Sequence, residues 1–132
     1  MKRILIIDDD VKITRLLVND LINKHRFEVV WLQTAYDILK TLKGSLFDAV
    51  ILDIMMPIPE DWTIDEKRRS ANGLATGIIL FEKIRNVYPL IPIIIYSAKK
   101  ATIKDKYTSF LSKPEFPDVI VEHLNKLISN EN

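Results

Sequence analysis

Five polar side chains lie where apolar runs of the sequence end, and their types suit phosphoryl chemistry. Asp8 and Asp9 follow the first run, Asp53 follows another, Ser97 closes a third and Lys113 follows a fourth. In open α/β sheets, ligands bind beyond the carboxyl ends of the strands. Three carboxylates placed together repel one another unless a cation joins them, and oxygen ligands without His or Cys favour Mg²⁺. Such a site can receive a phosphoryl group on a carboxylate, while an ammonium and a hydroxyl stabilise the charge.

Apolar runs and helical periodicity alternate along the chain. The runs predict five strands, at residues 3–7, 27–32, 49–52, 91–96 and 107–111. Apolar residues at helical spacing predict helices over residues 11–24, about 34–44, 74–87 and from Pro117 onward. Strands that alternate with helices favour a parallel sheet with right-handed crossovers. We therefore expect an α/β fold, a doubly wound five-stranded parallel sheet of flavodoxin-like order 2-1-3-4-5 with helices on both faces.

Local signals place several helix ends. Asp10 is the predicted N-cap of the first helix. The pattern from Thr34 to Asp37 matches a capping box, and Gly44 is the predicted end of that helix. The polar residues 99–106 leave room for two helical turns at most.

The amino-acid composition of the chain limits the classes of function that it can have. The 132 residues fit one domain, here 1–132, and include no cysteine for a disulfide or a thiolate metal site. The formal net charge of +1 gives no support to nucleic-acid or membrane binding through bulk charge. The apolar run at residues 4–7 is too short for a secretory signal, and no run is long enough to span a membrane. We expect a cytoplasmic protein.

The motifs together resemble one known family. The matching segments are residues 4–10 (ILIIDDD), 50–57 (VILDIMMP), 93–98 (IIIYSA) and 110–114 (FLSKP). With these segments the whole chain resembles the receiver domain of two-component response regulators. The resemblance implies that Asp53 accepts a phosphoryl group from a phosphohistidine on a histidine kinase or histidine phosphotransfer protein. It also implies a cis bond before Pro114, which would aim Lys113 inward.

The resemblance assigns the remaining site roles. Asp8 and Asp9 match the acidic pair that binds Mg²⁺, with Asp9 the more direct ligand, and the backbone carbonyl of Met55 matches another ligand beside Asp53. Ser97 matches the switch hydroxyl, and Lys113 the lysine that pairs with the phosphoryl group. Phe110 matches the aromatic switch position. The expected protein is a stand-alone signalling phosphoacceptor rather than an enzyme, and acts on an unknown downstream protein.

The sequence departs from the family at two places. Residues 58–73 form an insertion after the third strand, and Gly77 best matches the glycine that the family places soon after this strand. We expect the insertion to fold beside or over the phosphorylation site; the alternative is a solvated loop. The stretch between Ser97 and Lys113 is short by several residues, so the helix there must be stunted or irregular.

Other functions remain open at this point. One alternative is a pseudo-receiver that binds partners without being phosphorylated. Another is a haloacid-dehalogenase-type phosphatase that uses Asp8 as its nucleophile, although this leaves Asp53 without a role. A flavin or nucleotide site is disfavoured because the sequence has no glycine-rich phosphate loop.

Overall fold

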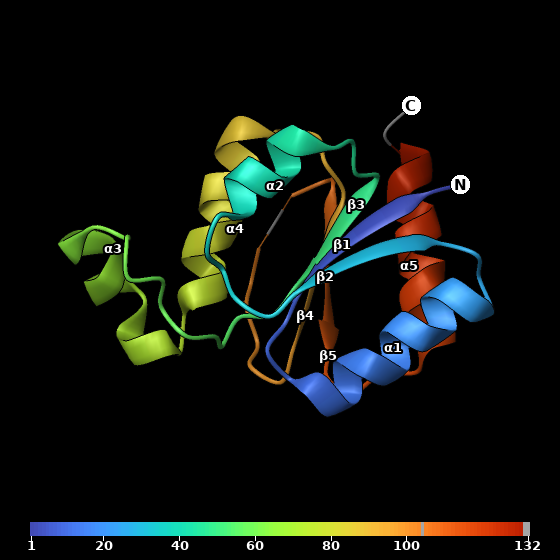
Figure 1. Ribbon diagram of the computed structural model, residues 1–132, viewed down its shortest axis with the longest axis horizontal. Coiled ribbons are helices and arrows are strands. Elements are labelled where there is room, and N and C mark those ends of the chain that lie inside the picture. The colour runs from blue at the N-terminus through green and yellow to red at the C-terminus, as the bar shows by residue number, and fades with distance from the viewer. Residues whose placement is uncertain (104, 131–132) are drawn as a thin grey trace.

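In the computed structural model, which describes residues 1–103 and 105–130, five parallel strands form one sheet (Figure 1). The strands are β1 (Arg3–Ile7), β2 (Glu28–Leu32), β3 (Ala49–Leu52), β4 (Ile93–Ser97) and β5 (Thr108–Ser112). Their order, β2-β1-β3-β4-β5, confirms the predicted one. Because neighbouring strands all run parallel, their carboxyl ends lie at the same edge of the sheet.

Helices cover both faces of this sheet (Figure 1). The helices α1 (Val11–Asn23) and α5 (Pro117–Asn130) pack on one face, and α2 (Ile38–Gly44) and α4 (Thr76–Val87) on the other. Successive residues of a strand therefore enter opposite cores, so all four residues of β3 are buried. No helix in the described part of the chain combines the length and apolar character needed to cross a lipid bilayer.

The start of α2 corrects one prediction. Asp10 does cap α1, since its Oδ1 accepts a hydrogen bond from the backbone N–H of Ile13 at 3.2 Å. The pattern from Thr34 to Asp37, however, forms no capping box: Asp37 has a left-handed φ of 58° and its side chain does not cap the helix. The intervening Ala35 is buried in the core, so the chain must turn again before α2 begins. The helix predicted over residues 74–87 is α4, and it begins at Thr76, two residues later than predicted.

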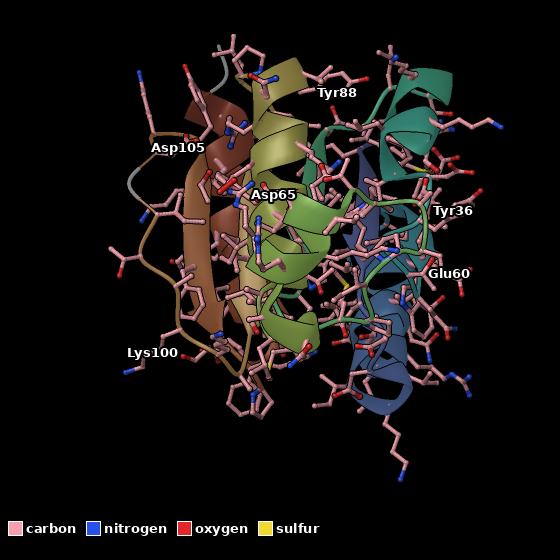
Figure 2. The ribbon with its side chains drawn as sticks, turned by 90° about the vertical axis from the view of Figure 1, so that its left-hand side faces the viewer. Tyr36, Glu60, Asp65, Tyr88, Lys100 and Asp105 are labelled. Carbon is pink, nitrogen blue, oxygen red and sulfur yellow. The ribbon has the colours of Figure 1, made fainter. Side chains whose placement is uncertain are left out.

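The insertion (residues 58–73) contains a short helix, α3 (Ile64–Arg69), and a 3-10 turn, η1 (Ala71–Gly73). Thr63 and Glu66 form a capping box at the start of α3, so the box lies here and not at α2. Ion pairs from Arg69 to Glu82 and from Lys83 to Glu66 fasten the insertion to α4. Figure 2 shows α3, which carries Asp65, in front of α4, and Figure 1 shows it at the side of the molecule. The helical part of the insertion thus lies beside α4 and does not cover the sheet edge.

The linking segment (residues 98–107) joins β4 to β5. Its described residues, 98–103 and 105–107, contain no helix, whereas the sequence predicted a stunted or irregular one of two turns at most. Figure 2 labels two of its described residues, Lys100 and Asp105. Arg85 of α4 holds it through an ion pair with Asp105 at 2.7 Å. The linking segment therefore packs on the same face of the sheet as α2 and α4, through Ala101 and Ile103. Its described residues do so without forming a helix.

Candidate functional site

Three charged side chains meet at the carboxyl edge of the sheet. The Nζ atom of Lys113 lies 2.6 Å from Oδ2 of Asp8 and 3.1 Å from Oδ2 of Asp53. All three side chains are less than a tenth exposed. They come from the ends of β5, β1 and β3, so the sheet itself brings together residues more than a hundred positions apart.

Backbone donors fix the orientation of both buried carboxylates. The other oxygen of Asp53, Oδ1, accepts a hydrogen bond from the N–H of Ile54 at 2.7 Å. Oδ1 of Asp8 accepts one from the N–H of Asp10 at 2.9 Å. The peptide bond between Lys113 and Pro114 is cis, as the resemblance implied. Each carboxylate is thus held between an ammonium and a backbone N–H.

Asp9 completes an acidic trio (Asp8, Asp9 and Asp53). One carboxylate oxygen from each residue lies within 4.8 Å of the other two. Asp8 and Asp53 are buried, whereas Asp9 is exposed, so the trio opens to solvent on one side. These oxygens are hard ligands that suit a divalent cation with free positions for water.

The other predicted site residues are Ser97, Phe110 and Met55. Ser97 is fully buried, and its Oγ accepts a hydrogen bond from the N–H of Lys99 at 3.2 Å, which leaves its own O–H able to donate. Ser97 also adjoins the site through its carbonyl, which accepts from the N–H of Lys113 at 3.0 Å. Phe110 is partly buried against the α2 and α4 core. The side chain of Met55 is exposed.

Two long-range contacts at the site have no signal in the sequence. The indole Nε1 of Trp31 donates to the backbone carbonyl of Asp8 at 2.9 Å. The Nζ of Lys99 donates to the carbonyl of Leu74, just past the insertion, at 3.0 Å. Both depend on tertiary placement, since the partners lie 23 and 25 residues apart.

Burial and the neighbouring charged groups shift the pKa values of Asp8 and Lys113 in opposite directions. Burial raises the pKa of Asp8 above the ordinary aspartate value, and hydrogen bonds from Lys113 and the N–H of Asp10 only partly offset this rise. Burial alone would lower the pKa of Lys113, but Asp8 and Asp53 outweigh it and the net pKa lies above the ordinary lysine value. Lys113 therefore stays charged at neutral pH, and its charge is shared between two carboxylates.

The raised pKa of Asp8 predicts a pH-dependent stability without divalent cations. A carboxyl group with a higher pKa in the folded state than its ordinary 3.8 binds its proton more tightly when folded. Its stabilising contribution is complete below the unfolded-state pKa and is lost as the pH rises through the folded-state pKa. We expect Asp8→Asn to remove this loss, so the variant gains stability over the parent as the pH rises. Urea unfolding in EDTA from about pH 4 to pH 8 measures the effect.

Asp37→Asn is the matched control for this prediction. Asp37 is exposed and has a left-handed backbone, which asparagine also adopts. The control should follow the parent at every pH. Equal pH profiles for Asp8→Asn and the parent would contradict the prediction.

Solved structures with the same fold come from several organisms. A CheY-like response regulator receiver domain protein from Methanospirillum hungatei is 21% identical, with a TM-score of 0.74, and the match covers 99% of this chain and 96% of that one. The chain has the receiver fold. A sensor protein from Polaromonas has a TM-score of 0.75 at 22% identity, with 99% and 98% of the two chains covered. Response regulator TrrA from Thermotoga maritima, solved with Mg²⁺ and BeF, has a TM-score of 0.71 at 24% identity, with 96% and 99% covered.

Comparison by sequence gives no match to a protein-family model or to a curated protein. The receiver fold is therefore evident from the structure and not from overall sequence similarity. The acidic trio and Lys113 lie at the carboxyl edge, where open α/β sheets bind their ligands.

Proposed function

We propose that this chain is a phosphoacceptor signalling domain of a two-component system or phosphorelay, in which Asp53 takes a phosphoryl group from a phosphohistidine. The observation that supports this best is the meeting of Asp8, Asp9, Asp53 and Lys113 at one edge of a receiver fold. On this proposal residues 1–132 act as one receiver domain. It is not a classical enzyme, because it becomes modified itself and passes the signal on through protein contacts.

The proposed step is a transfer between two proteins. A carboxylate oxygen of Asp53 attacks the phosphorus, the new P–O bond forms and the P–N bond to the donor histidine breaks. The imidazole leaves with the electron pair of that bond and takes up a proton from solvent. Lys113, already 3.1 Å from Asp53, would move its ammonium onto the phosphoryl oxygens, and the O–H of Ser97 would donate to them.

The donor set fits Mg²⁺. Asp8, Asp9 and Asp53 supply three carboxylates, and Lys113 supplies one ammonium, which pairs with the two buried carboxylates. A divalent cation would offset the excess charge, and the ligands are all oxygens. The carbonyl of Met55 would complete the protein ligands. When bound, the ion would neutralise charge on the transferring phosphoryl group.

The partners follow from the chemistry. The donor would be a histidine kinase or a histidine phosphotransfer protein, and the receiver of the signal a downstream protein. Ser97 and Phe110 would form the switch; because phenylalanine has no hydroxyl, its part is one of packing.

The test is labelling with a small phosphodonor, such as acetyl phosphate, with and without Mg²⁺. Intact-mass and peptide-mapping mass spectrometry would locate the adduct in the parent, in Asp53→Asn and in the control Asp37→Asn. We expect a Mg²⁺-dependent adduct on Asp53 in the parent and the control and none in Asp53→Asn. The mutation removes the nucleophile, so labelling should disappear and not merely slow.

Two outcomes would contradict the proposal. A folded parent that acquires no adduct, even from a panel of phosphohistidine donors, would favour a pseudo-receiver. An adduct on Asp8 would favour the phosphatase alternative.

A further inference from the structure

Trp31 reaches from the edge strand β2 into the acidic turn after β1. Its ring packs against the α1 and α5 core, and its Nε1 donates to the carbonyl of Asp8 at 2.9 Å. In the strand register Trp31 lies opposite Ile6, two residues before Asp8. The indole therefore extends past the end of the sheet ladder to make this contact.

The contact fixes the peptide unit that leads to Asp9. The N–H of Asp8 donates to the carbonyl of Leu32 at 3.0 Å, so both backbone polar groups of Asp8 bind the end of β2. Because a peptide unit is planar, holding the Asp8 carbonyl also sets the direction of the Asp9 N–Cα bond. Asp9 is the exposed member of the acidic trio, and its carboxylate position depends on that direction.

We propose that Trp31 is a positioning residue that sets the divalent-cation affinity of the acidic trio by holding the peptide between Asp8 and Asp9. This inference rests on the proposed function, because it concerns the same metal site. Partners that orient ligating residues commonly change metal affinity by about 10- to 100-fold when lost. Here the partner is an indole N–H that acts through the backbone.

The test must separate the hydrogen bond from the packing of the ring. The chain contains two tryptophans, Trp31 and Trp62, so Trp62→Phe leaves Trp31 as the only one. In that background a tryptophan auxotroph can replace Trp31 by β-(3-benzothienyl)alanine, in which sulfur takes the place of the N–H. The ring keeps its shape and loses only the donor.

Two quantities are then measured on the same protein: the Mg²⁺ dissociation constant by calorimetry and the Tm in EDTA. We expect the dissociation constant to rise about tenfold on loss of the N–H, while the Tm stays close to that of Trp62→Phe. A purely structural role would lower the Tm and leave Mg²⁺ affinity unchanged, and that result would overturn the inference.

Fluorescence gives a second measurement that needs no unnatural residue. In Trp62→Phe, Mg²⁺ should change the emission of Trp31 with the midpoint found by calorimetry. In Trp31→Phe, the emission of Trp62, which lies in the insertion beside Lys83, should not respond. Trp31 emission that ignores bound Mg²⁺ would also overturn the inference. A parent that binds no Mg²⁺ and takes up no phosphoryl group would instead overturn the proposed function itself.

Discussion

Replacing Gly77 by alanine is expected to destabilise the fold and displace Asp53. A Cβ atom at Gly77 would lie 1.9 Å from the carbonyl oxygen of Asp53 and 2.6 Å from the Cα of Ile54. Both obstacles are backbone atoms, so no side chain can move aside. The N–H of Gly77 also donates to the carbonyl of Ile54 at 2.7 Å, which holds the first turn of α4 close to the residue that follows Asp53.

The added methyl group must push α4 away from β3 or shift Asp53. Overpacking at a rigid contact costs typically 1 to 3 kcal/mol and sometimes more, and we expect about 3 kcal/mol or more here. For a chain of this size that corresponds to a fall in Tm of roughly 10 °C. Thermal unfolding followed by circular dichroism measures the fall, and phosphodonor labelling measures the displacement of Asp53.

Gly44→Ala is the matched control. Gly44 ends α2, and a Cβ there meets nothing within 4 Å. Alanine is the better helix former, so this Tm should stay the same or rise slightly. If Gly77→Ala kept the parental Tm and labelling, the close approach of α4 to Asp53 would be wrong.

The sequence predicts the strands of this fold well because their signal is local. The run at residues 49–52 is apolar without interruption, and the structure buries every residue of it. The site residues Asp8, Asp53 and Lys113 could also be placed, since parallel strands bring their carboxyl ends to one edge. Pattern and topology were sufficient there.

Capping shows where local pattern fails. Thr34 to Asp37 and Thr63 to Glu66 both match the same four-residue motif. Only Glu66 reaches back to its N-cap, where its carboxylate accepts the N–H of Thr63 at 2.8 Å. Asp37 has a side chain one methylene shorter, and its backbone is turned to the left-handed region. The motif alone could not distinguish the two segments. Whether a capping box forms also depends on tertiary packing, and Ala35, inside the first motif, is buried in the core.

The long-range side-chain contacts could not be predicted from the sequence. The bonds from Trp31 to Asp8 and from Lys99 to Leu74 join residues whose types carry no pairing signal. The same holds for Arg85, because nothing in the sequence indicates the contacts that its guanidinium makes.

Arg85→Gln is expected to loosen the linking segment and destabilise the fold. The guanidinium of Arg85 donates to the carbonyl of Ile91 at 2.6 Å, to Oγ1 of Thr108 at 2.8 Å and to the carboxylate of Asp105 at 2.7 Å. It thus joins α4, the entrance to β4, the linking segment and the start of β5. The ion pair is only 15% and 19% exposed on its two sides, so glutamine would leave Asp105 without its partner in a poorly hydrated place.

Removing one member of a buried ion pair costs about 3 to 5 kcal/mol, and partial exposure reduces our expectation to about 2 to 3 kcal/mol. Arg69→Gln is the matched control: Arg69 pairs with Glu82, but both side chains are about half exposed, so the change should cost much less than Arg85→Gln. Arg85→Lys should fall between the two, because lysine keeps the charge and loses the planar fork that serves several acceptors.

Urea unfolding measures the free energies of the three variants, and amide hydrogen exchange locates the change. Faster exchange should appear in the N–H of Tyr107, which donates to Asp105, and in the N–H of Thr108. The centre of the sheet should keep its protection, since β1 and β3 make no use of Arg85. A cost equal to that of Arg69→Gln would show that the linking segment holds its place by its apolar contacts, through Ala101 and Ile103, and not by this guanidinium.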